Sequence, residues 1–355
     1  MKLKQYIGRH RTNLVTYGVV ILGFVIMQML SASHMLSSSV EGFLVPICAY
    51  VVLAVSLNLV VGISGELSLG HAGFMGVGAF TGIIVAALLK TVIASKVLLL
   101  IVAIVCGGVM AGLFGVVIGL PVMRLRGDYL AIVTLAFGEI LKNLINNMYV
   151  GSDVNGVHFV IGTEKPLLAD GGSMIINGPM GATGVAKLAT FPIGFALILV
   201  TLFVVLNLIN SKEGRAIKAV RDNRIAAESV GINVTAFRLK AFVVSAFLAG
   251  MAGALYLNYS SLTASKFNFN TSINILVFVV LGGMGNILGS IISATVLYIL
   301  PEAMRGLQDY RMILYAVVLI VVMLFTWSPK VKEVWSVVSE KAVGIFKKKE
   351  AGTNE

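Results

Sequence analysis

The chain has 355 residues, of which 58% are hydrophobic and only 12% are charged, and its formal net charge is +11. Soluble domains carry about 25% charged residues, so this composition excludes a water-soluble enzyme. Low charge is also the opposite of the pattern that keeps a chain disordered. We expect no nucleic-acid partner, because the lysines and arginines are divided among segments between apolar stretches instead of forming one basic surface.

Long apolar stretches recur along nearly the whole chain. A bilayer core needs about 20 apolar residues of helix, and the sequence predicts eight full spans, at residues 14–30, 43–61, 67–89, 97–120, 129–144, 191–209, 241–257 and 312–327. The first is longer than the apolar core of a signal peptide, which favours an uncleaved anchor. We expect an all-α fold, a polytopic integral membrane helical bundle over residues 14–327.

The densest group of polar residues at membrane depth follows the second predicted span. It consists of Asn58, Ser64, Gly65, Glu66, Ser68 and His71. Polar groups inside a membrane are costly and by default mark a cavity or pathway, and irregular backbone there must be buried in protein or line water. We therefore predict that this segment lines part of a translocation path. The alternative is a tight cytoplasmic turn in which Glu66 and His71 are solvated.

A ninth apolar stretch, 273–300, is interrupted at its centre by Gly283, Gly285 and Asn286. Paired interruptions in corresponding positions of two halves point to a site at a repeat interface. Together with the segment after Asn58, this stretch predicts a two-half internal repeat with broken or re-entrant helices and places these three residues on the path. Glycine-rich membrane helices also form for close packing alone.

Glu139 is a further candidate for the path, because it lies inside the span 129–144. Lys142 follows one helical turn later on the same face. The sequence predicts that Glu139 either forms an internal ion pair with Lys142 or contacts the substrate.

The positions of the basic residues predict the orientation of the chain. Cytoplasmic segments hold an excess of lysine and arginine, and most of the 27 such residues fall in the tail 1–13, the turn 121–128, the segment 210–240 and the tail 328–355. We therefore expect these four segments and both termini to be cytoplasmic. The loop 148–190 is then external.

Segment 210–240, the basic segment, predicts two short amphipathic helices ending at Gly231. It contains Arg215, Arg221 and Arg224. Such a pair of helices could dock a soluble partner, and the alternative is a solvated loop.

The chain has no Gly-x-x-x-x-Gly-Lys-Ser/Thr loop for nucleotide phosphates and no histidine and carboxylate at metal-ligand spacing. We expect no cofactor, no metal and no enzymatic activity, so energy must come from a partner or an ion gradient.

The run 226–232 resembles the loop with which permeases of bacterial ABC importers contact their ATPases. Together with residues 64–74, 124–132 and 282–285, it makes the chain, over about 43–300, similar to the LivM-type permeases of branched-chain amino acid ABC transporters. The resemblance implies that Ala226, Ala227, Glu228 and Gly231, with the three arginines, form the ATPase-coupling loop of a permease domain. At Glu66 many relatives carry an amide.

The resemblance also implies a set of partners in the bacterial cytoplasmic (inner) membrane. They are a second homologous permease, two cytoplasmic ATP-binding subunits that bind the ATP, an external substrate-binding protein and the membrane lipid. The expected function is ATP-driven, alternating-access import of leucine, isoleucine or valine. A urea or short-amide ABC permease and an ion-coupled secondary transporter are the alternatives.

Overall fold

The structure is a computed structural model. It describes residues 2–303 except 34–37, 91, 126, 154–155, 163–164, 167, 169–171, 183–186 and 260–262, and also residues 313, 316, 317 and 320. The rest of the predicted span 312–327 and the predicted tail 328–355 lie outside the described residues. Two compact units divide the chain, Met1–Val296 and Leu297–Glu355, and the first contains most of the described residues.

Most of the first unit is helical. Its amino-terminal half contains α1 (Lys2–Ala32), α2 (Ser38–Asn58), a π-helical turn η1 (Leu59–Ser64), α3 (His71–Leu89), α4 (Lys96–Val122) and α5 (Asp128–Asn146). The later helices are α6 (Phe191–Asn210), α7 (Lys212–Asp222), α8 (Arg224–Ser229), α9 (Val234–Leu257), η3 (Ala264–Lys266), α10 (Phe269–Gly282) and the start of α11 (Ile287–Ala303). Residues 2–13 of the predicted tail are the first part of helix α1.

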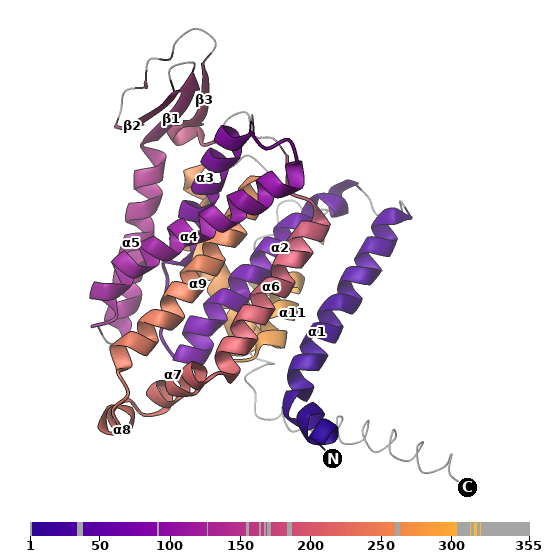
Figure 1. The fold of residues 1–355 in the computed structure, drawn as a ribbon, viewed down its shortest axis with the longest axis vertical. Helices are drawn as coiled ribbons and strands as arrows, with labels where there is room; N and C mark the ends of the chain where they lie inside the picture. Colours follow the sequence, from indigo (N-terminus) through magenta and orange to yellow (C-terminus); the bar gives the residue numbers. More distant parts are fainter. Residues whose placement is uncertain are drawn as a thin grey trace. The chain divides into compact units, whose positions relative to one another are not determined.

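Helix α9 is at the centre of the unit, where it packs against α2, α3 and α4 (Figure 1). Small residues make this close packing possible. A Cβ atom added at Gly78 in α3 would lie 2.5 Å from the carbonyl carbon of Gly250 in α9, so the two backbones touch. Close approach at small residues is the usual way in which helices associate without a hydrophobic driving force in lipid.

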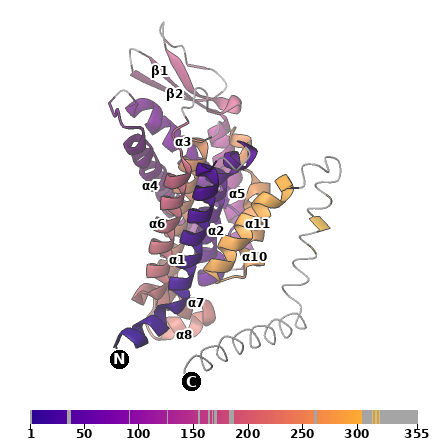
Figure 2. The ribbon, with the colours of Figure 1, turned by 90° about the vertical axis from the view of Figure 1, so that its right-hand side faces the viewer.

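Seven helical segments among the described residues are long and apolar enough to cross a membrane. They are Asn13–Ser31, Val40–Ser64, His71–Leu89, Lys96–Val122, Phe191–Asn210, Val234–Leu257 and Ala264–Gly282. Helix α5 forms over the predicted span 129–144 but is not one of the seven. The predicted span 67–89 is helical only from His71. The stretch 273–300 is divided between α10 and α11, and α10 lies beside α2 (Figure 2).

The loop 148–190 contains an antiparallel sheet, so the prediction of an all-α fold is wrong at this point. Its strands are β1 (Met148–Asp153), β2 (Gly156–Ile161) and β3 (Ser173–Asn177), in the order β2-β1-β3. The register pairs Met148 with Ile161 and Asp153 with Gly156. The strand β2 is an edge strand, and its alternate residues Val157, Phe159 and Ile161 are exposed, as the period of two requires.

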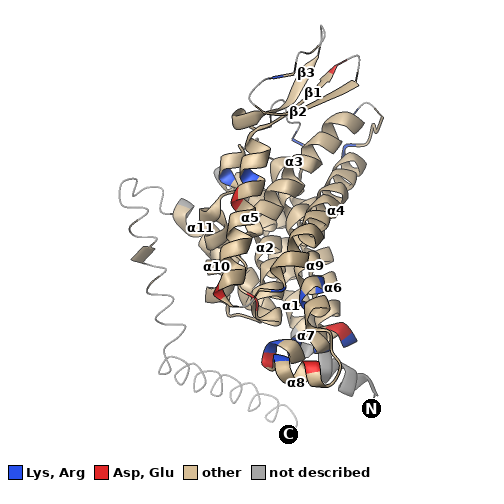
Figure 3. Ribbon diagram, turned by 90° about the vertical axis from the view of Figure 1, so that its left-hand side faces the viewer, with Lys and Arg blue, Asp and Glu red and all other residues tan. Residues whose placement is uncertain are grey.

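The sheet and the pair α7 and α8 lie at opposite ends of the helical unit (Figure 1). Charged residues gather in α7 and α8 (Figure 3). Between the two ends, α3 and α6 contain no Asp, Glu, Lys or Arg. This separation of charge is what a chain spanning an apolar layer needs, because ionised groups are stable only where water reaches them or an ion pairs with them.

Candidate transport site and basic segment

Helix α2 does not stop at its last α-helical residue but continues into the buried π-turn η1 and then into the non-helical residues 65–70. We call residues 59–70 the first break. Gly65 ends the π-turn with a left-handed φ of 74°, and the Glu66 amide donates a 3.0 Å hydrogen bond to the Val60 carbonyl. Single π-turns inside helices frequently mark functional sites.

The second break comprises residues 283–286, between α10 and α11. Gly283 and Gly285 have φ angles of 91° and 85°, which a residue with a side chain rarely adopts. The side chain of Asn286 accepts a 3.1 Å hydrogen bond from the Gly289 amide and so caps the start of α11. The local sequence thus both ends one helix and begins the next within a few residues.

The two breaks are in contact. The Asn58 side chain, which is fully buried, accepts a 2.8 Å hydrogen bond from the Gly285 amide and donates bonds of 3.1 Å to the Asn286 carbonyl and 2.7 Å to the Ser290 hydroxyl. A Cβ atom added at Gly62 would lie 2.8 Å from the Gly285 Cα. Backbone therefore meets backbone here, and Asn58 pairs the Gly285 amide, which lies outside both helices.

Glu66 forms an ion pair with Arg238 at the start of α9. The two side chains are only 16% and 4% exposed, so neither is solvated. Arg238 also donates a 3.1 Å hydrogen bond to the Met123 carbonyl at the end of α4. The pair therefore ties the first break to two helices. Arg238 was not predicted as a site residue from the sequence, where the available signal was an arginine close to the start of an apolar stretch.

His71, at the first residue of α3, is buried as well. Its Nε2 atom lies 2.8 Å from the Ser56 hydroxyl, which donates a 2.9 Å hydrogen bond to the Leu53 carbonyl. Because a hydroxyl has one proton, the Nε2-protonated tautomer of His71 satisfies both contacts. The Ser56 carbonyl accepts a 2.6 Å bond from Ser245 of α9. His71 thus belongs to a polar chain that joins α2, α3 and α9.

Two hydroxyl groups in the first break have unused hydrogen-bonding capacity. Ser64 and Ser68 are both buried, and their Oγ atoms have no hydrogen-bond partner within the described part of the chain. Buried polar groups are nearly always paired, so each hydroxyl can still form a hydrogen bond with another molecule.

Glu139 pairs with Lys142, as the ion-pair alternative predicted. Its other oxygen accepts a 3.0 Å hydrogen bond from the Phe269 amide, at the first residue of α10. A carboxylate at this position satisfies an amide that has no partner within the helix. Glu139 therefore anchors the beginning of α10, whereas Asn58 contacts the break that follows its end.

Both short helices of the basic segment are present and capped. The Ser211 hydroxyl accepts from the Gly214 amide at 3.1 Å, and the Asn223 side chain accepts from the Ala226 amide at 3.0 Å. Gly231 then adopts a φ of 82°. A small core of Val220, Ala227 and Val234, with Ile232 against it, joins the two helices to the start of α9.

The outer surface of α8 is unusual for a hydrophilic segment. Ile225 and Val230 are 80% and 74% exposed, while Ala226 and Glu228 are also exposed and Ala227 faces the small core. Arg224 bonds Glu228 at 3.0 Å, one helical turn away. Two large aliphatic side chains are thus exposed on an otherwise charged pair of helices.

Arg221 links the basic segment to the first break. Its guanidinium donates a 3.0 Å hydrogen bond to the Gly62 carbonyl, and a Cβ atom added at Gly65 would lie 2.7 Å from the Arg221 Cγ. Arg215, by contrast, bonds the Asn210 carbonyl at 3.3 Å within its own segment. No group of metal-ligating side chains occurs among the described residues.

Comparison with known proteins shows similarity to a family of transport proteins. The family model "Branched-chain amino acid transport system / permease component" matches residues 39–325. The chain is 35% identical over 295 residues to the high-affinity branched-chain amino acid transport system permease protein LivM of Escherichia coli (strain K12), covering 79% of this chain and 67% of that protein.

More distant similarities extend to other permeases. The chain is 25% identical over 289 residues to the LivH permease protein of the same strain, which covers 78% of this chain and 88% of that protein. It is 26% identical over 167 residues to the nucleoside ABC transporter permease protein NupC of Lactococcus lactis subsp. cremoris (strain MG1363), over 40% and 53% of the two chains. No solved structure matches.

The extent of the family match decides what kind of protein this is. It covers most of the chain, including both breaks and the basic segment. ATP in such a system is bound by partner subunits, and the absence of a phosphate-binding loop in the sequence agrees with that division of labour. The chain therefore belongs to the family of permease components of branched-chain amino acid ABC transport systems, and it is a multi-pass membrane transport subunit, not an ATPase.

Proposed function

We propose that this permease moves leucine, isoleucine or valine into the bacterial cytoplasm by ATP-driven alternating access. Its partners are a second, homologous permease, two cytoplasmic ATP-binding subunits and an external substrate-binding protein. Similarity to permeases of both the LivM and the LivH type supports a pair of related permeases. The termini and the basic segment face the cytoplasm, since lysine and arginine accumulate on that side, and the sheet of β1 to β3 is external.

The ATP-binding subunits dock on the basic segment. The exposed side chains of Ile225 and Val230 provide an apolar contact, Arg224 and Glu228 of the same helix add charge beside it, and the exposed Arg215 adds a further positive charge to the basic segment. Ala226 is exposed and belongs to the same surface, whereas Ala227 and Gly231 shape the turn from within. An apolar centre with a charged rim is the usual anatomy of a protein interface.

The observation that carries the proposal is the contact of Arg221 with Gly62. Through this contact, a displacement of α7 by the ATP-binding subunits acts directly on the first break. From there, Asn58 passes the displacement to Gly285 and Asn286 in the second break. The two breaks are the irregular backbone at membrane depth where a transport path is expected to be built.

The chemistry around the breaks suits a branched-chain amino acid. Ser64 and Ser68 offer buried hydroxyls, and the residues between η1 and α3 offer backbone groups outside a regular helix. The ammonium and carboxylate of a zwitterion need only a few such groups, while an aliphatic side chain needs apolar surroundings and no dedicated ligand. Glu66 and His71 are already paired, so they support the walls of the path and do not bind the solute.

Reconstitution tests the proposal. The complete complex in proteoliposomes, supplied with the substrate-binding protein, should accumulate labelled leucine when ATP is enclosed with the ATP-binding subunits and not when ATP is withheld. Labelled urea and a short amide in parallel vesicles test the alternative solutes. Uptake that persists without the ATP-binding subunits and disappears with an ionophore would instead make the chain an ion-coupled transporter.

A further inference from the structure

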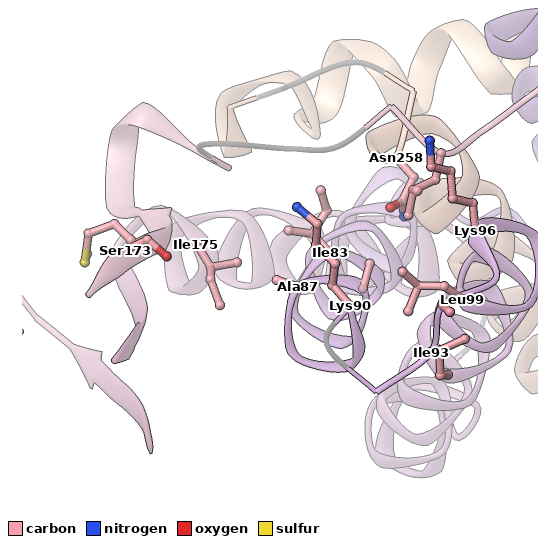
Figure 4. A pocket seen from close by; sticks show the side chains of 13 residues that line it. Ile83, Ala87, Lys90, Ile93, Lys96, Leu99, Ser173, Ile175 and Asn258 are labelled. Atoms are coloured by element: carbon pink, nitrogen blue, oxygen red, sulfur yellow. The ribbon is translucent and has the colours of Figure 1, made fainter. Parts of the chain in front are cut away.

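A cavity of about 450 Å³ opens at the end of the helical unit that carries the sheet (Figure 4). Its walls come from α3, from the turn between α3 and α4, from the start of α4, from β3 and from two further segments at Leu188 and Asn258. Its volume is within the range of about 300–1,000 Å³ typical of small-molecule sites. The cavity includes none of the residues of the two breaks.

The charge in this cavity is of one sign. Lys90, directly after α3, and Lys96, the first residue of α4, both line it, and among the described residues no aspartate or glutamate does. Neither lysine forms an ion pair with any of the described residues. Two ammonium groups without a carboxylate favour a ligand of net negative charge. A zwitterionic amino acid would place its own ammonium group among cations, so this cavity does not suit the proposed substrate.

The remainder of the wall is largely apolar. Ile83 and Leu99 are buried residues on facing helices, and Ile93, Ile175 and Leu188 continue the apolar surface. Ser173 and Asn258 add polar atoms. A small inorganic anion would leave this apolar surface unused, whereas a molecule with an anionic group and a hydrocarbon chain would use both parts of the wall.

The position in the fold identifies the source of such a molecule. Helices α3 and α4 are both membrane-spanning candidates, and the two lysines lie at adjacent ends of them. The ends of spans lie at the level of the lipid headgroups. Basic pockets between spans on the cytoplasmic side bind anionic headgroups, and the same attraction between ammonium and phosphate applies at this end, which the proposed orientation makes external. We infer that this cavity is a site for an anionic phospholipid, whose phosphate contacts Lys90 and Lys96 and whose acyl chain begins along Ile83 and Leu99.

The inference requires that the cavity lies at the level of the lipid headgroups, but it does not depend on which solute is transported. It can therefore fail while the proposed function stands. The assembled complex, exchanged into nanodiscs of equal parts phosphatidylglycerol and phosphatidylcholine, is analysed by native mass spectrometry. The wild type should retain phosphatidylglycerol in preference to phosphatidylcholine. The double variant Lys90→Gln/Lys96→Gln should retain it at least about tenfold less, because each basic residue near a headgroup contributes to binding.

Two further variants distinguish a lipid bound in the cavity from a general effect of surface charge. Lys165→Gln removes one charge from an exposed residue of the segment between β2 and β3 and should leave retention unchanged. Ala87→Trp, which fills the cavity without altering its charge, should lower retention as the lysine variants do. Equal retention by wild type and Lys90→Gln/Lys96→Gln would overturn the inference.

The ligand source is tested separately. Glycerol 3-phosphate or inorganic phosphate that displaces the lipid at low concentration would make this a site for a free anion. Weaker binding of the substrate-binding protein to Lys90→Gln/Lys96→Gln in lipid-free detergent, with lipid retention unchanged, would make it a protein interface. Either result contradicts the lipid site.

Discussion

The guanidinium of Arg221 donates a 3.0 Å hydrogen bond to the carbonyl of Gly62, which joins helix α7 of the basic segment to the π-turn that ends α2. The turn leaves backbone carbonyls outside the regular α-helical pattern, and the arginine supplies a donor to one of them. A residue expected from its position to face an ATP-binding subunit thus also faces the interior of the permease.

Replacement of Arg221 should separate ATP hydrolysis from transport. In Arg221→Gln the donor to Gly62 is shortened and uncharged, so we expect leucine uptake by the complete complex to fall at least about tenfold, equivalent to the loss of one charge-assisted hydrogen bond. Hydrolysis by the ATP-binding subunits should continue. Uptake and hydrolysis are measured in the same proteoliposomes.

The matched control for this variant is Lys218→Gln, which removes one positive charge from the same helix, and within the described part of the chain Lys218 forms no hydrogen bond or ion pair with the first break. Arg221→Lys should restore little, because an ammonium group cannot reproduce the reach and geometry of the guanidinium. Normal uptake by Arg221→Gln would show that the contact does not transmit movement.

A methyl group at Gly62 should destabilise the protein. The added Cβ atom would lie 2.8 Å from the Gly285 Cα, closer than real Cβ atoms approach a backbone, and such overpacking costs about 1–3 kcal/mol. The variant Gly62→Ala should therefore unfold at a lower temperature in detergent. Gly23→Ala is the control, because a Cβ atom at Gly23 has nothing within 4 Å. Equal unfolding temperatures would contradict the contact between the breaks.

The ion pair of Glu66 and Arg238 should behave as a buried pair. Removing one partner leaves a buried charge without its counterion and costs about 3–5 kcal/mol. Arg238 is the more buried of the two, so Glu66→Gln should lower the yield of folded protein on gel filtration. The double variant Glu66→Gln/Arg238→Met should recover part of it, and a double variant worse than both single ones would argue against direct pairing.

The exposed aliphatic residues of α8 should matter only in the assembled complex. Ile225→Asp and Val230→Asp place a charge where an apolar contact is proposed, so each should weaken co-purification of the ATP-binding subunits while the permease inserts and unfolds as before. Val157→Asp on strand β2 is the control, since Val157 is also exposed but lies at the opposite end of the unit. Loss of co-purification in this control would point to a general defect.

The proposed orientation can be tested with reporters. A reporter protein that is active only in the cytoplasm should be active when fused after Ser211 or at the carboxyl terminus. A reporter that is active only outside the membrane should be active when fused within residues 151–184. The reason is the distribution of lysine and arginine. An external carboxyl terminus would require an odd number of crossings after the basic segment and would contradict the proposal.

Patterns within a few residues were sufficient to predict much of this fold. Hydropathy located the apolar helices, and glycines located both breaks and the turn after α8, which contains Gly231. The pairing of Glu139 with Lys142 followed from helical spacing. Each of these features depends on residues that are close together in the sequence, so the geometry of the local backbone is enough to predict it.

Features that depend on partners far apart in the chain were missed. Glu66 gave no indication that Arg238 would neutralise it, and His71 gave none that Ser56 would bond its ring. The three strands were overlooked because each is five or six residues long within a glycine-rich loop, and a strand becomes visible through its neighbours in the sheet.

The glycine-to-glycine contact between the two breaks has a mechanical consequence. Side chains that interdigitate must change rotamer before two helices can slide, but Gly62 and Gly285 present only smooth main chain to each other. A shift of one break past the other must therefore break the three hydrogen bonds of a single amide side chain, that of Asn58, while no side chain of Gly62 or Gly285 stands in the way.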